Sequence, residues 1–447
     1  MPPQPTAVFR LMRLRVWKSS DISQHPATNA SVQFQTCGVA CPSGARARSC
    51  RTFTWPHFVW PCRPAFADFL QRQDIVSSDS GRRVGLYCAP GGAIPVSLIP
   101  GFRGSEVIPK NLIIVAENIH ATRVVISPER GGKKAVLLDD GGVAVTYNAL
   151  DGTKALMRLA DDYKQSPEYG EGKIKHVRVA VEKGMMGQPD GIEYLQSMAK
   201  SQIDAGAGFL DVNVDEISPT VEKQVEAMTW VARRLGQFSP APLSIDSSRP
   251  QVIEAGLEVC DPSKGRPLIN SASLERPELL DSAVKYNTDV IVSAFGRTGM
   301  PSGVEDRVAN IAEMMRCVDD RGIKRDRVFL DPLVLPVGTD PAAGKSFLET
   351  VRQLRSMYGP DVHITGGLSN VSFGIPGRPL LNEVFFLLAL EAGCDSAIID
   401  PTQVRVENVD KIDRDSLAFR LSHDALTGKD PFCMDYIAAF REGKLRS

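Results

Sequence analysis

Net charge, histidine and long apolar runs are all scarce in this sequence of 447 residues. The formal charge at pH 7 is only -1, so the chain lacks the basic balance typical of nucleic-acid-binding proteins. No uninterrupted apolar run approaches the roughly 20 residues that a membrane-spanning helix needs. Neither His120 nor His363, the histidines in strand-like regions, has the i, i+4 partner of a zinc-binding helix. We therefore expect a soluble protein with no metal site, no nucleic-acid partner and no membrane partner.

Residues 1–108 differ in composition from the rest of the chain. Residues 1–100 contain eleven Lys and Arg against four Asp and Glu, and they hold five of the nine cysteines. They show no sustained helical or strand period, which predicts an N-terminal extension that is largely disordered or not part of the native protein. An Arg-rich, acid-poor composition is also typical of transit peptides, and an over-extended reading frame would explain it equally well. The cysteine spacing is too irregular for zinc.

From residue 109 onward, short apolar runs alternate with amphipathic helical stretches. After the first gap the runs recur roughly every 25 to 40 residues, the spacing that strand-loop-helix units need. Between two of them, Ile192, Leu195, Met198 and Ile203 share one helical face. Eight such runs predict a TIM (β/α)8 barrel over residues 109–447 rather than an open doubly wound sheet. The runs are Leu112–Ile119, Gly208–Val214, Pro242–Ser247, Pro267–Ser273, Asp289–Phe295, Val328–Val334, His363–Ser369 and Ser396–Pro401.

The long first gap contains a β-hairpin signal. The stretch AVLLDDGGVAVTYNAL, residues 135–150, alternates apolar and polar residues on either side of a turn at Asp139–Gly142. We expect a β-hairpin insertion after strand 1, before the helix that begins near Asp190. Its position near the catalytic rim would allow it to form a lid.

Seven of the eight runs carry a carboxylate or an amide at or near the end. Because the strands of a parallel barrel are buried, burying such a side chain costs several kcal/mol of folding free energy unless it forms a hydrogen bond or an ion pair. Seven strands ending in this way predict a polar site at the carboxyl ends of the barrel, where barrel enzymes keep their chemistry. The residues are Glu117, Asn118, Asp211, Asn213, Asp246, Asn270, Asp331, Asn370 and Asp400.

The residue types at these strand ends favour a flat heterocycle. The stretch GGLSNVSFG lacks the Lys of a phosphate-binding loop, and Ser369 does not lie in a G-x-S-x-G nucleophile motif. Carboxylates can accept two parallel N–H bonds from the amidine-like edge of a pterin, and amides can bind edges that present both donors and acceptors. A pterin therefore fits this set of side chains.

Four motifs carry a resemblance to a known family: LSIDSSRPQVIEAGL, LINSAS, FLDPLVLPVG and GLSNVSFGIPGRPLLNEVF. Over about residues 109–430 the sequence resembles the pterin-binding barrel of methyltetrahydrofolate:corrinoid methyltransferases. This family includes the folate module of cobalamin-dependent methionine synthase. The resemblance implies that Asp246, Asn270 and Asp331 hold the pterin ring and that Asn370 reaches N5, the nitrogen that carries the methyl group. Strand one reads VAENIHATR here, where a Gly-Glu-Arg-Ile-Asn opening is more familiar in the family.

The resemblance also implies an activity. The expected enzyme moves the N5-methyl group between 5-methyltetrahydrofolate and the cobalt of a corrinoid (cobalamin) carried by a partner protein, in one-carbon metabolism, and the resemblance suggests a homodimer. The four cysteines after residue 108 are separated and unpatterned, which predicts a reduced, cytoplasmic protein. Its expected catalytic residues are Asn370 and Asp331. We expect Arg378 to support either the loop or the ligand and Arg297 to contact the anionic glutamate tail, with surface solvation as the alternative for both. The expected substrate-binding residues are Glu117, Asn118, Asp211, Asn213, Asp246, Asn270, Asp331, Gly367, Ser369, Asn370, Arg378 and Arg297.

Two other functions remain open at this point. A dihydropteroate synthase-like enzyme would share the barrel and the pterin, although its characteristic loop after strand one is missing. A noncatalytic folate-binding subunit would bind the pterin without moving a methyl group. The order D-x-H-x-x-G at His363 matches a cobalt-binding motif of corrinoid proteins, but it runs into the seventh predicted strand. The direction of transfer, the ultimate methyl donor and the corrinoid partner do not follow from the sequence.

Overall fold

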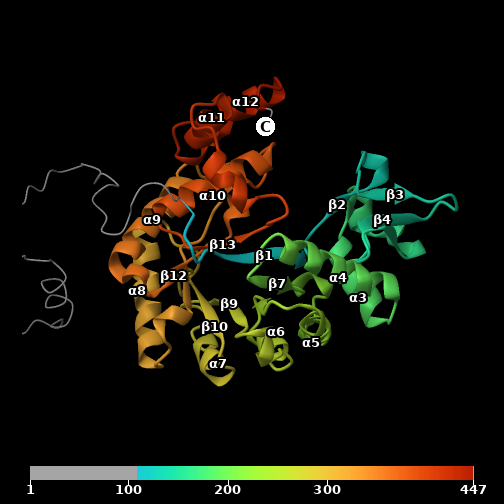
Figure 1. Cartoon of the computed structure of the whole chain (residues 1–447), viewed down its shortest axis with the longest axis horizontal. Coiled ribbons are helices and arrows are strands. Elements are labelled where there is room, and N and C mark those ends of the chain that lie inside the picture. Colours follow the sequence, from blue (N-terminus) through green and yellow to red (C-terminus); the bar gives the residue numbers. More distant parts are fainter. Residues whose placement is uncertain (1–107, 446–447) are drawn as a thin grey trace, which may run out of the picture. The chain divides into compact units, whose positions relative to one another are not determined.

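Eight parallel strands form a barrel in the computed structural model, which describes residues 108–445 (Figure 1). Their order in the sheet follows their order in the chain, as in a (β/α)8 barrel. Backbone hydrogen bonds from Asp395 N to Ile364 O (3.3 Å) and from Ile398 N to Gly366 O (3.0 Å) join the last strand to the seventh. The strands are β1 (Ile113–His120), β7 (Phe209–Asn213), β8 (Leu243–Asp246), β9 (Leu268–Ala272), β10 (Asp289–Ser293), β11 (Val328–Asp331), β12 (His363–Ile364) and β13 (Ser396–Ile399).

This arrangement confirms the predicted fold class, and each of the eight predicted apolar runs coincides with one strand, although β1 ends one residue beyond its run, at His120. One run is much shorter as a strand than expected. The run His363–Ser369 pairs only at His363–Ile364, and Leu368–Ser372 forms a 3-10 turn. Gly366 and Gly367 separate the two parts, and an added Cβ at Gly366 would lie 2.8 Å from the ring of Phe347. The chain bends here because only glycine permits so close an approach. The predicted N-terminal extension lies outside the described residues.

The strands are buried on both faces, as the near-continuous apolar runs predict. Alternate residues point into the barrel, where the rings of Phe209 and Phe329 meet edge to face at 6.2 Å. Burying each of these side chains is worth about 1.5–3 kcal/mol. The residues of the opposite strand faces pack against the surrounding helices. The interior cluster consists of Val115, Phe209, Leu268, Ile291, Phe329 and Ile398.

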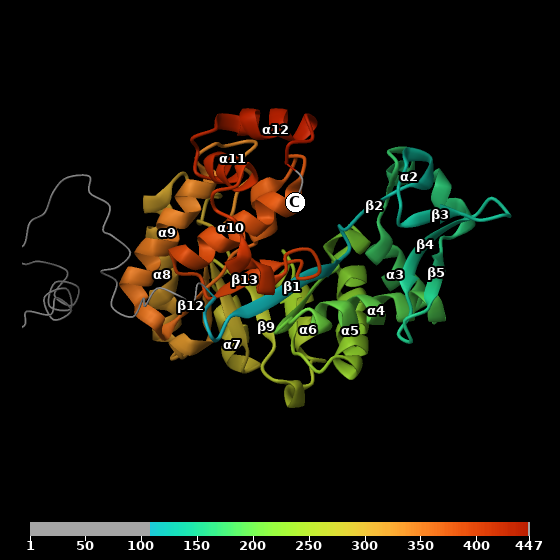
Figure 2. The same cartoon turned by 45° about the horizontal axis from the view of Figure 1, so that its top comes forward.

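Helices surround the barrel, and α11 (Leu417–Leu426) and α12 (Met434–Arg441) form a further layer outside α10 (Arg378–Ala392) (Figures 1 and 2). The helix before β13 is apolar on nearly every face, which fits its position beneath another layer of helix. No helix within residues 108–445 combines the length and apolarity needed to cross a membrane. The helices are α3 (His176–Met185), α4 (Pro189–Asp204), α5 (Val221–Phe238), α6 (Pro250–Leu257), α7 (Leu279–Lys285), α8 (Val304–Asp320), α9 (Ala343–Tyr358), α10 (Arg378–Ala392), α11 (Leu417–Leu426) and α12 (Met434–Arg441).

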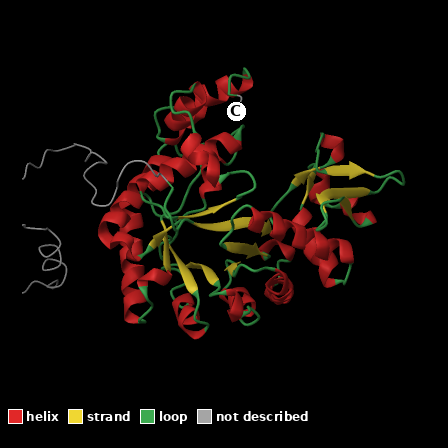
Figure 3. Ribbon diagram, viewed as in Figure 1, coloured by secondary structure: helices red, strands yellow, loops and turns green. Residues whose placement is uncertain are grey.

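The insertion after β1 is larger than the expected hairpin. Strands β3 (Ala135–Leu137) and β4 (Val143–Asn148) pair as predicted, and β5 (Lys154–Arg158) adds a third antiparallel strand (Figure 3). A second pair, β2 (Val125–Ile126) with β6 (Lys173–Ile174), and the short helix α2 (Pro167–Gly170) complete it.

The three-stranded sheet of the insertion packs on α4. The ring of Tyr147 meets that of Tyr194 at 5.2 Å, and its hydroxyl donates to Glu193 Oε2 at 3.0 Å. Val145 and Met157 are fully buried in the same core. These contacts attach the sheet to α4, and the lid role expected for the insertion stays a prediction.

Candidate active site at the carboxyl ends of the strands

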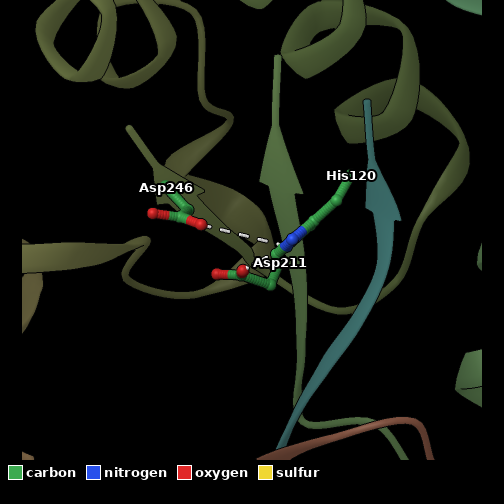
Figure 4. Close-up of side chains that lie close together, drawn as sticks. All are labelled: His120, Asp211 and Asp246. Atoms are coloured by element: carbon green, nitrogen blue, oxygen red, sulfur yellow. Dashed lines mark hydrogen bonds and ion pairs between the residues drawn. The ribbon is translucent and has the colours of Figure 1, made fainter. Parts of the chain in front are cut away.

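Three side chains from neighbouring strands meet at the carboxyl ends of the barrel: His120 of β1, Asp211 of β7 and Asp246 of β8 (Figure 4). His120 Nε2 lies 2.6 Å from Asp211 Oδ2 and 4.0 Å from Asp246 Oδ2. Asp211 is fully buried, whereas His120 and Asp246 keep some exposure at the mouth. The register that pairs His120 with Asn213 and Asn213 with Asp246 brings these strand ends together.

Two amides fix the carboxylates of this cluster. Asn213 Nδ2 donates to Asp246 Oδ2 at 3.0 Å, and Asn270 Nδ2 donates to Asp211 Oδ1 at 3.3 Å. Asn213 also accepts a hydrogen bond from the backbone N of Asp215 through Oδ1 (3.0 Å), so both ends of its amide are used within the protein. The side-chain oxygen Oδ1 of Asn270 accepts no hydrogen bond within the described chain, whereas its backbone O accepts one from Ser247 N at 3.3 Å. Asn213 therefore supports the site, while Asn270 retains an acceptor for a ligand.

The excess of negative charge in this cluster shifts its pKa values. Burial, together with the charge of Asp211, raises the pKa of Asp246 to about 7. Burial acts to lower the pKa of His120, but the hydrogen bond and charge of Asp211, with the charges of Asp246 and Glu117, raise it above its ordinary value. The imidazolium form of His120 is therefore favoured beside the two carboxylates.

The same three residues could also hold a metal ion. One nitrogen of His120 and one carboxylate oxygen each of Asp211 and Asp246 lie within 4.8 Å of one another. Within residues 108–445, these three are the His, Cys, Asp or Glu side chains that lie close enough together to bind one metal ion. Imidazole and carboxylate together suit several divalent cations. The i, i+4 spacing of a zinc-binding helix could not reveal this set, because its members lie on three different strands.

Asp331 ends β11 a short way around the barrel. Its Oδ1 accepts a hydrogen bond from the backbone N of Leu333 at 2.8 Å, which stabilises the left-handed backbone of that leucine (φ 68°). Burial raises the pKa of Asp331 to about 6, although this hydrogen bond and the charge of Arg307 lower it. The carboxylate is thus ionised at neutral pH and retains the capacity to accept further N–H groups.

Glu117, Asn118 and Asp400 are committed to protein contacts. Asn118 Nδ2 donates to Asp400 Oδ1 at 2.7 Å, which links β1 to the end of β13. Asp400 Oδ1 also accepts from the hydroxyl of Thr402 at 2.6 Å. Glu117 forms an ion pair with Arg123 at 2.9 Å. These residues close the barrel rim, so the structure gives them supporting contacts beside the predicted site.

Asn370 lies in the 3-10 turn after β12, and its side chain is exposed. Within residues 108–445 its amide has no side-chain hydrogen bond, although a Cβ added at Gly367 would approach its Nδ2 to 2.9 Å. Arg378 holds this turn: its Nη2 donates to Ser369 O at 2.8 Å and its Nε to Ser372 Oγ at 3.1 Å. Asn370 is therefore free to bind a ligand on a turn that Arg378 and Ser369 support.

Arg297 does not join this group. It lies in the loop after β10, 60% exposed, in an ion pair with Glu313 of α8 at 2.5 Å. None of its contacts links it to the central cluster. The expected contact with an anionic ligand tail would require Arg297 to leave this pair.

The sequence reasoning missed two residues. His120 was considered only as a zinc ligand with a helical partner, although its place at the end of a predicted strand was signal enough to include it. Arg307 lies on a helix and is 2% exposed, so nothing in the strand-end pattern could identify it. Its position relative to Asp331 depends on how α8 packs on the barrel.

Three comparisons place the chain among known proteins. Residues 183–400 match the family described as pterin binding enzyme. The methylcorrinoid:tetrahydrofolate methyltransferase of Eubacterium limosum is 31% identical over 258 residues, which cover 56% of this chain and 89% of that relative. The methionine synthase of Mycobacterium tuberculosis is 30% identical over 245 residues, which cover 51% of this chain but only 20% of that relative.

The solved structure of dihydropteroate synthase from Xanthomonas albilineans, in complex with 7,8-dihydropteroate, is 20% identical with a TM-score of 0.41, covering 49% of this chain and 83% of that one. The functional assignment rests instead on the sequence relative from Eubacterium limosum, most of whose length this chain spans. With the pterin-binding match over strands β7 to β13, the chain belongs to the methylcorrinoid:tetrahydrofolate methyltransferase family of pterin-binding enzymes.

Proposed function

We propose that this chain moves the N5-methyl group between 5-methyltetrahydrofolate and the cobalt of a corrinoid that a partner protein carries. The observation that carries the proposal is the 31% identity to the methylcorrinoid:tetrahydrofolate methyltransferase over 89% of that relative. The name of that relative describes a transfer from the corrinoid to the folate, whereas the family resemblance covers both directions. The geometry at the strand ends supports the proposal, as follows.

The pterin ring would lie across the ends of β8, β9 and β11. Asp246 and Asp331 offer carboxylates that can each accept two parallel N–H bonds, the pattern that an amidine-like ring edge presents. Asn270 offers the carbonyl oxygen that its bond to Asp211 leaves free. Asp211 and Asn213 would act by holding Asn270 and Asp246 in position.

Asn370 would act on the reacting nitrogen. A tertiary amine loses its methyl group readily only when its nitrogen receives a proton or a strong hydrogen bond in the transition state. The amide of Asn370 can donate such a bond, because no other residue of the described chain occupies it. An amide is not an acid, so we expect water to supply the proton itself.

The corrinoid supplies a cobalt centre that gains or gives up the methyl group. This chain's contribution is an exposed turn at Asn370, which leaves the reacting nitrogen accessible from outside the barrel. Burial lowers the pKa of Arg378, which holds this turn, while the charge of Glu117 acts to raise it. The two side chains would hold the rim while the partner protein approaches.

Two experiments on the full-length chain test this function directly. We expect 5-methyltetrahydrofolate to bind in a calorimetric titration, and Co(I) cobalamin to be converted to methylcobalamin in a single-turnover absorbance experiment. Binding without methyl transfer would indicate a noncatalytic folate-binding subunit. Formation of dihydropteroate from a pterin pyrophosphate and p-aminobenzoate would indicate a dihydropteroate synthase instead. Absence of folate binding would overturn the proposal.

We also propose that the enzyme is a cytoplasmic homodimer, as the resemblance implies. The four cysteines of the described chain, Cys260, Cys317, Cys394 and Cys433, are all free, which supports a reducing compartment. Sedimentation of the full chain at micromolar concentration checks the oligomeric state. A mass of one chain across the concentration range would contradict the dimer.

A further inference from the structure

Arg307 is a buried cation that the mechanism above does not use. It lies in the first turns of α8 and is only 2% exposed. Its Nε atom has no hydrogen-bond partner, and within residues 108–445 its guanidinium forms neither a hydrogen bond nor an ion pair. Leaving a buried charged group without such partners costs several kcal/mol. A partner that arrives with the ligand would offset this cost.

The packing of α8 places Arg307 beside the pterin-binding end of the barrel. Asn310 lies one turn further along the same helix, and its Nδ2 donates to the backbone O of Ala294 at 2.9 Å, just after β10. The backbone N of Ala294 in turn donates to the backbone O of Asp331 at 2.9 Å. The first turns of α8 are thus attached to the carboxyl ends of β10 and β11.

The charges around Arg307 point to the same place. Burial lowers the pKa of Arg307, while the charges of Asp340 and Asp331 raise it. The same interaction acts on Asp331, whose pKa the charge of Arg307 lowers. The two side chains therefore share one electrostatic environment, yet no direct hydrogen bond joins them.

The chemistry of a pterin edge fits a carboxylate with a guanidinium beside it. The 2-amino group and N3–H donate to a carboxylate, and the 4-oxo group next to N3 is an acceptor. A ring whose N–H groups bind Asp331 presents this oxygen immediately to one side of the carboxylate. Arg307 has N–H donors without acceptors and carries the charge that an oxygen acceptor prefers.

We propose that Arg307 donates a hydrogen bond to the 4-oxo group of the bound pterin and makes the site select 4-oxo over 4-amino rings. This inference rests on the proposed function, since it takes the ring to be a pterin held by Asp331. The alternative role is a positioning one, in which Arg307 only favours the ionised form of Asp331. The two roles differ in one respect: an effect through Asp331 weakens every ligand that uses the amidine edge, whatever stands at position 4.

The experiment compares two ligands on the full-length chain. Calorimetry gives the Kd of 5-methyltetrahydrofolate, which has a 4-oxo group, and of a 2,4-diaminopteridine antifolate, which has a 4-amino group. In the wild type we expect the 4-oxo ligand to bind more tightly. In Arg307→Met we expect the ratio of the two affinities to fall at least tenfold, because only the 4-oxo ligand loses a charge-assisted bond.

Two further variants serve as controls. Arg307→Lys keeps the charge and a donor, so it should retain part of the preference, and Arg316→Met removes an exposed arginine from the same helix and should leave the ratio unchanged. Thermal melts establish that each variant is folded. An unchanged ratio in folded Arg307→Met, with both ligands weakened equally, would overturn the inference and leave the proposed function standing. Failure of the wild type to bind 5-methyltetrahydrofolate would overturn both.

Discussion

At the scale of single residues, Asp331 places function and stability in opposition. Burial raises its pKa to about 6, so the folded protein binds a proton more tightly than the unfolded chain does. Stability then falls as the pH rises from about 4 to 6 and stays lower above that range, by about 1–3 kcal/mol. This loss of stability comes from ionising the buried carboxylate of Asp331, which must be ionised to accept the N–H groups of a ligand.

Asp331→Asn should therefore stabilise the free protein and weaken binding. We expect its free energy of unfolding at pH 8 to rise by about 1–2 kcal/mol, since the buried charge is gone. The Kd of 5-methyltetrahydrofolate should rise by about 10- to 100-fold, because an amide cannot replace a charged double acceptor. Urea unfolding and calorimetry measure the two effects. Loss of stability together with unchanged affinity would show that Asp331 is a structural residue.

The pH dependence of folate binding gives a second prediction for the same residue. In the wild type the affinity should fall as the pH drops through about 6, where Asp331 takes up its proton in the free protein. In Asp331→Asn the part of this fall near pH 6 should be absent, while the part that comes from protonation of Asp246 near pH 7 should remain in both proteins. Calorimetric titrations from pH 5 to pH 8 measure it, and a profile that is identical in the two proteins would assign the dependence to another group.

The strand-end residues show how far single positions could be predicted. The period of the strands predicted correctly that Asp246 and Asp331 end their strands and that Asp211 and Asn270 lie within theirs. It did not predict which side-chain amides form hydrogen bonds within the protein, because Asn118 donates to Asp400 and Asn213 donates to Asp246, residues that are distant in the sequence. Those contacts depend on the register between strands that are distant in the sequence.

At the scale of elements, the turn Leu368–Ser372 decides where Asn370 points. A methyl group added at Gly367 would press on Asn370 Nδ2 at 2.9 Å, while its φ of -71° suits alanine. We expect Gly367→Ala to displace the amide and to slow methyl transfer about tenfold, with the Kd for folate changed less than about threefold. Single-turnover rates and calorimetry separate these effects.

Gly236 of α5 provides the matched control for this substitution. An added Cβ meets nothing within 4 Å there, so Gly236→Ala should stabilise the helix by about 0.5–1 kcal/mol and leave methyl transfer unchanged. A slowing of transfer in both variants would indicate a general effect of the added methyl group. A normal rate in folded Gly367→Ala would contradict the assigned role of the turn.

The insertion is an element with its own anchor on the barrel wall. Tyr147→Ala removes the ring contact with Tyr194 and the hydrogen bond to Glu193. We expect amide hydrogen exchange to increase in strands β3 to β5 and the free energy of unfolding to drop by about 1–3 kcal/mol. Because this sheet contacts α4 rather than the strand ends, the Kd for folate should stay within about twofold. A large loss of affinity would support the lid interpretation.

The sequence predicted the first hairpin of this insertion but not its third strand. Alternation around the turn Asp139–Gly142 is a local signal, and the structure has β3 and β4 there. Strand β5, KALMR, is short, and it is ordered by pairing with β4 and by burial of Met157. The packing of the sheet on Tyr194 was not predictable either, because it is a tertiary contact that no local pattern contains.

At the scale of the whole molecule, the barrel brings one face of every strand to a shared interior and every polar strand end to a shared mouth. The spacing of the eight apolar runs was sufficient to predict this architecture, because each strand-helix unit is local and the units close in chain order. The position of α8 over β10 and β11 was not predictable, and the exposure of Arg307 depends on it. The family assignment rests on the relative from Eubacterium limosum, most of whose length this chain spans.

The central claim is that Asn370 assists the breaking or forming of the bond between N5 and the methyl group. Its most direct test is the single-turnover rate of methyl transfer from saturating 5-methyltetrahydrofolate to Co(I) cobalamin, in wild type and in Asn370→Ala. We expect the variant to bind the folate within about tenfold of wild type and to transfer the methyl group about 100-fold or more slowly, because the hydrogen bond strengthens in the transition state. Equal rates at saturation would contradict the account.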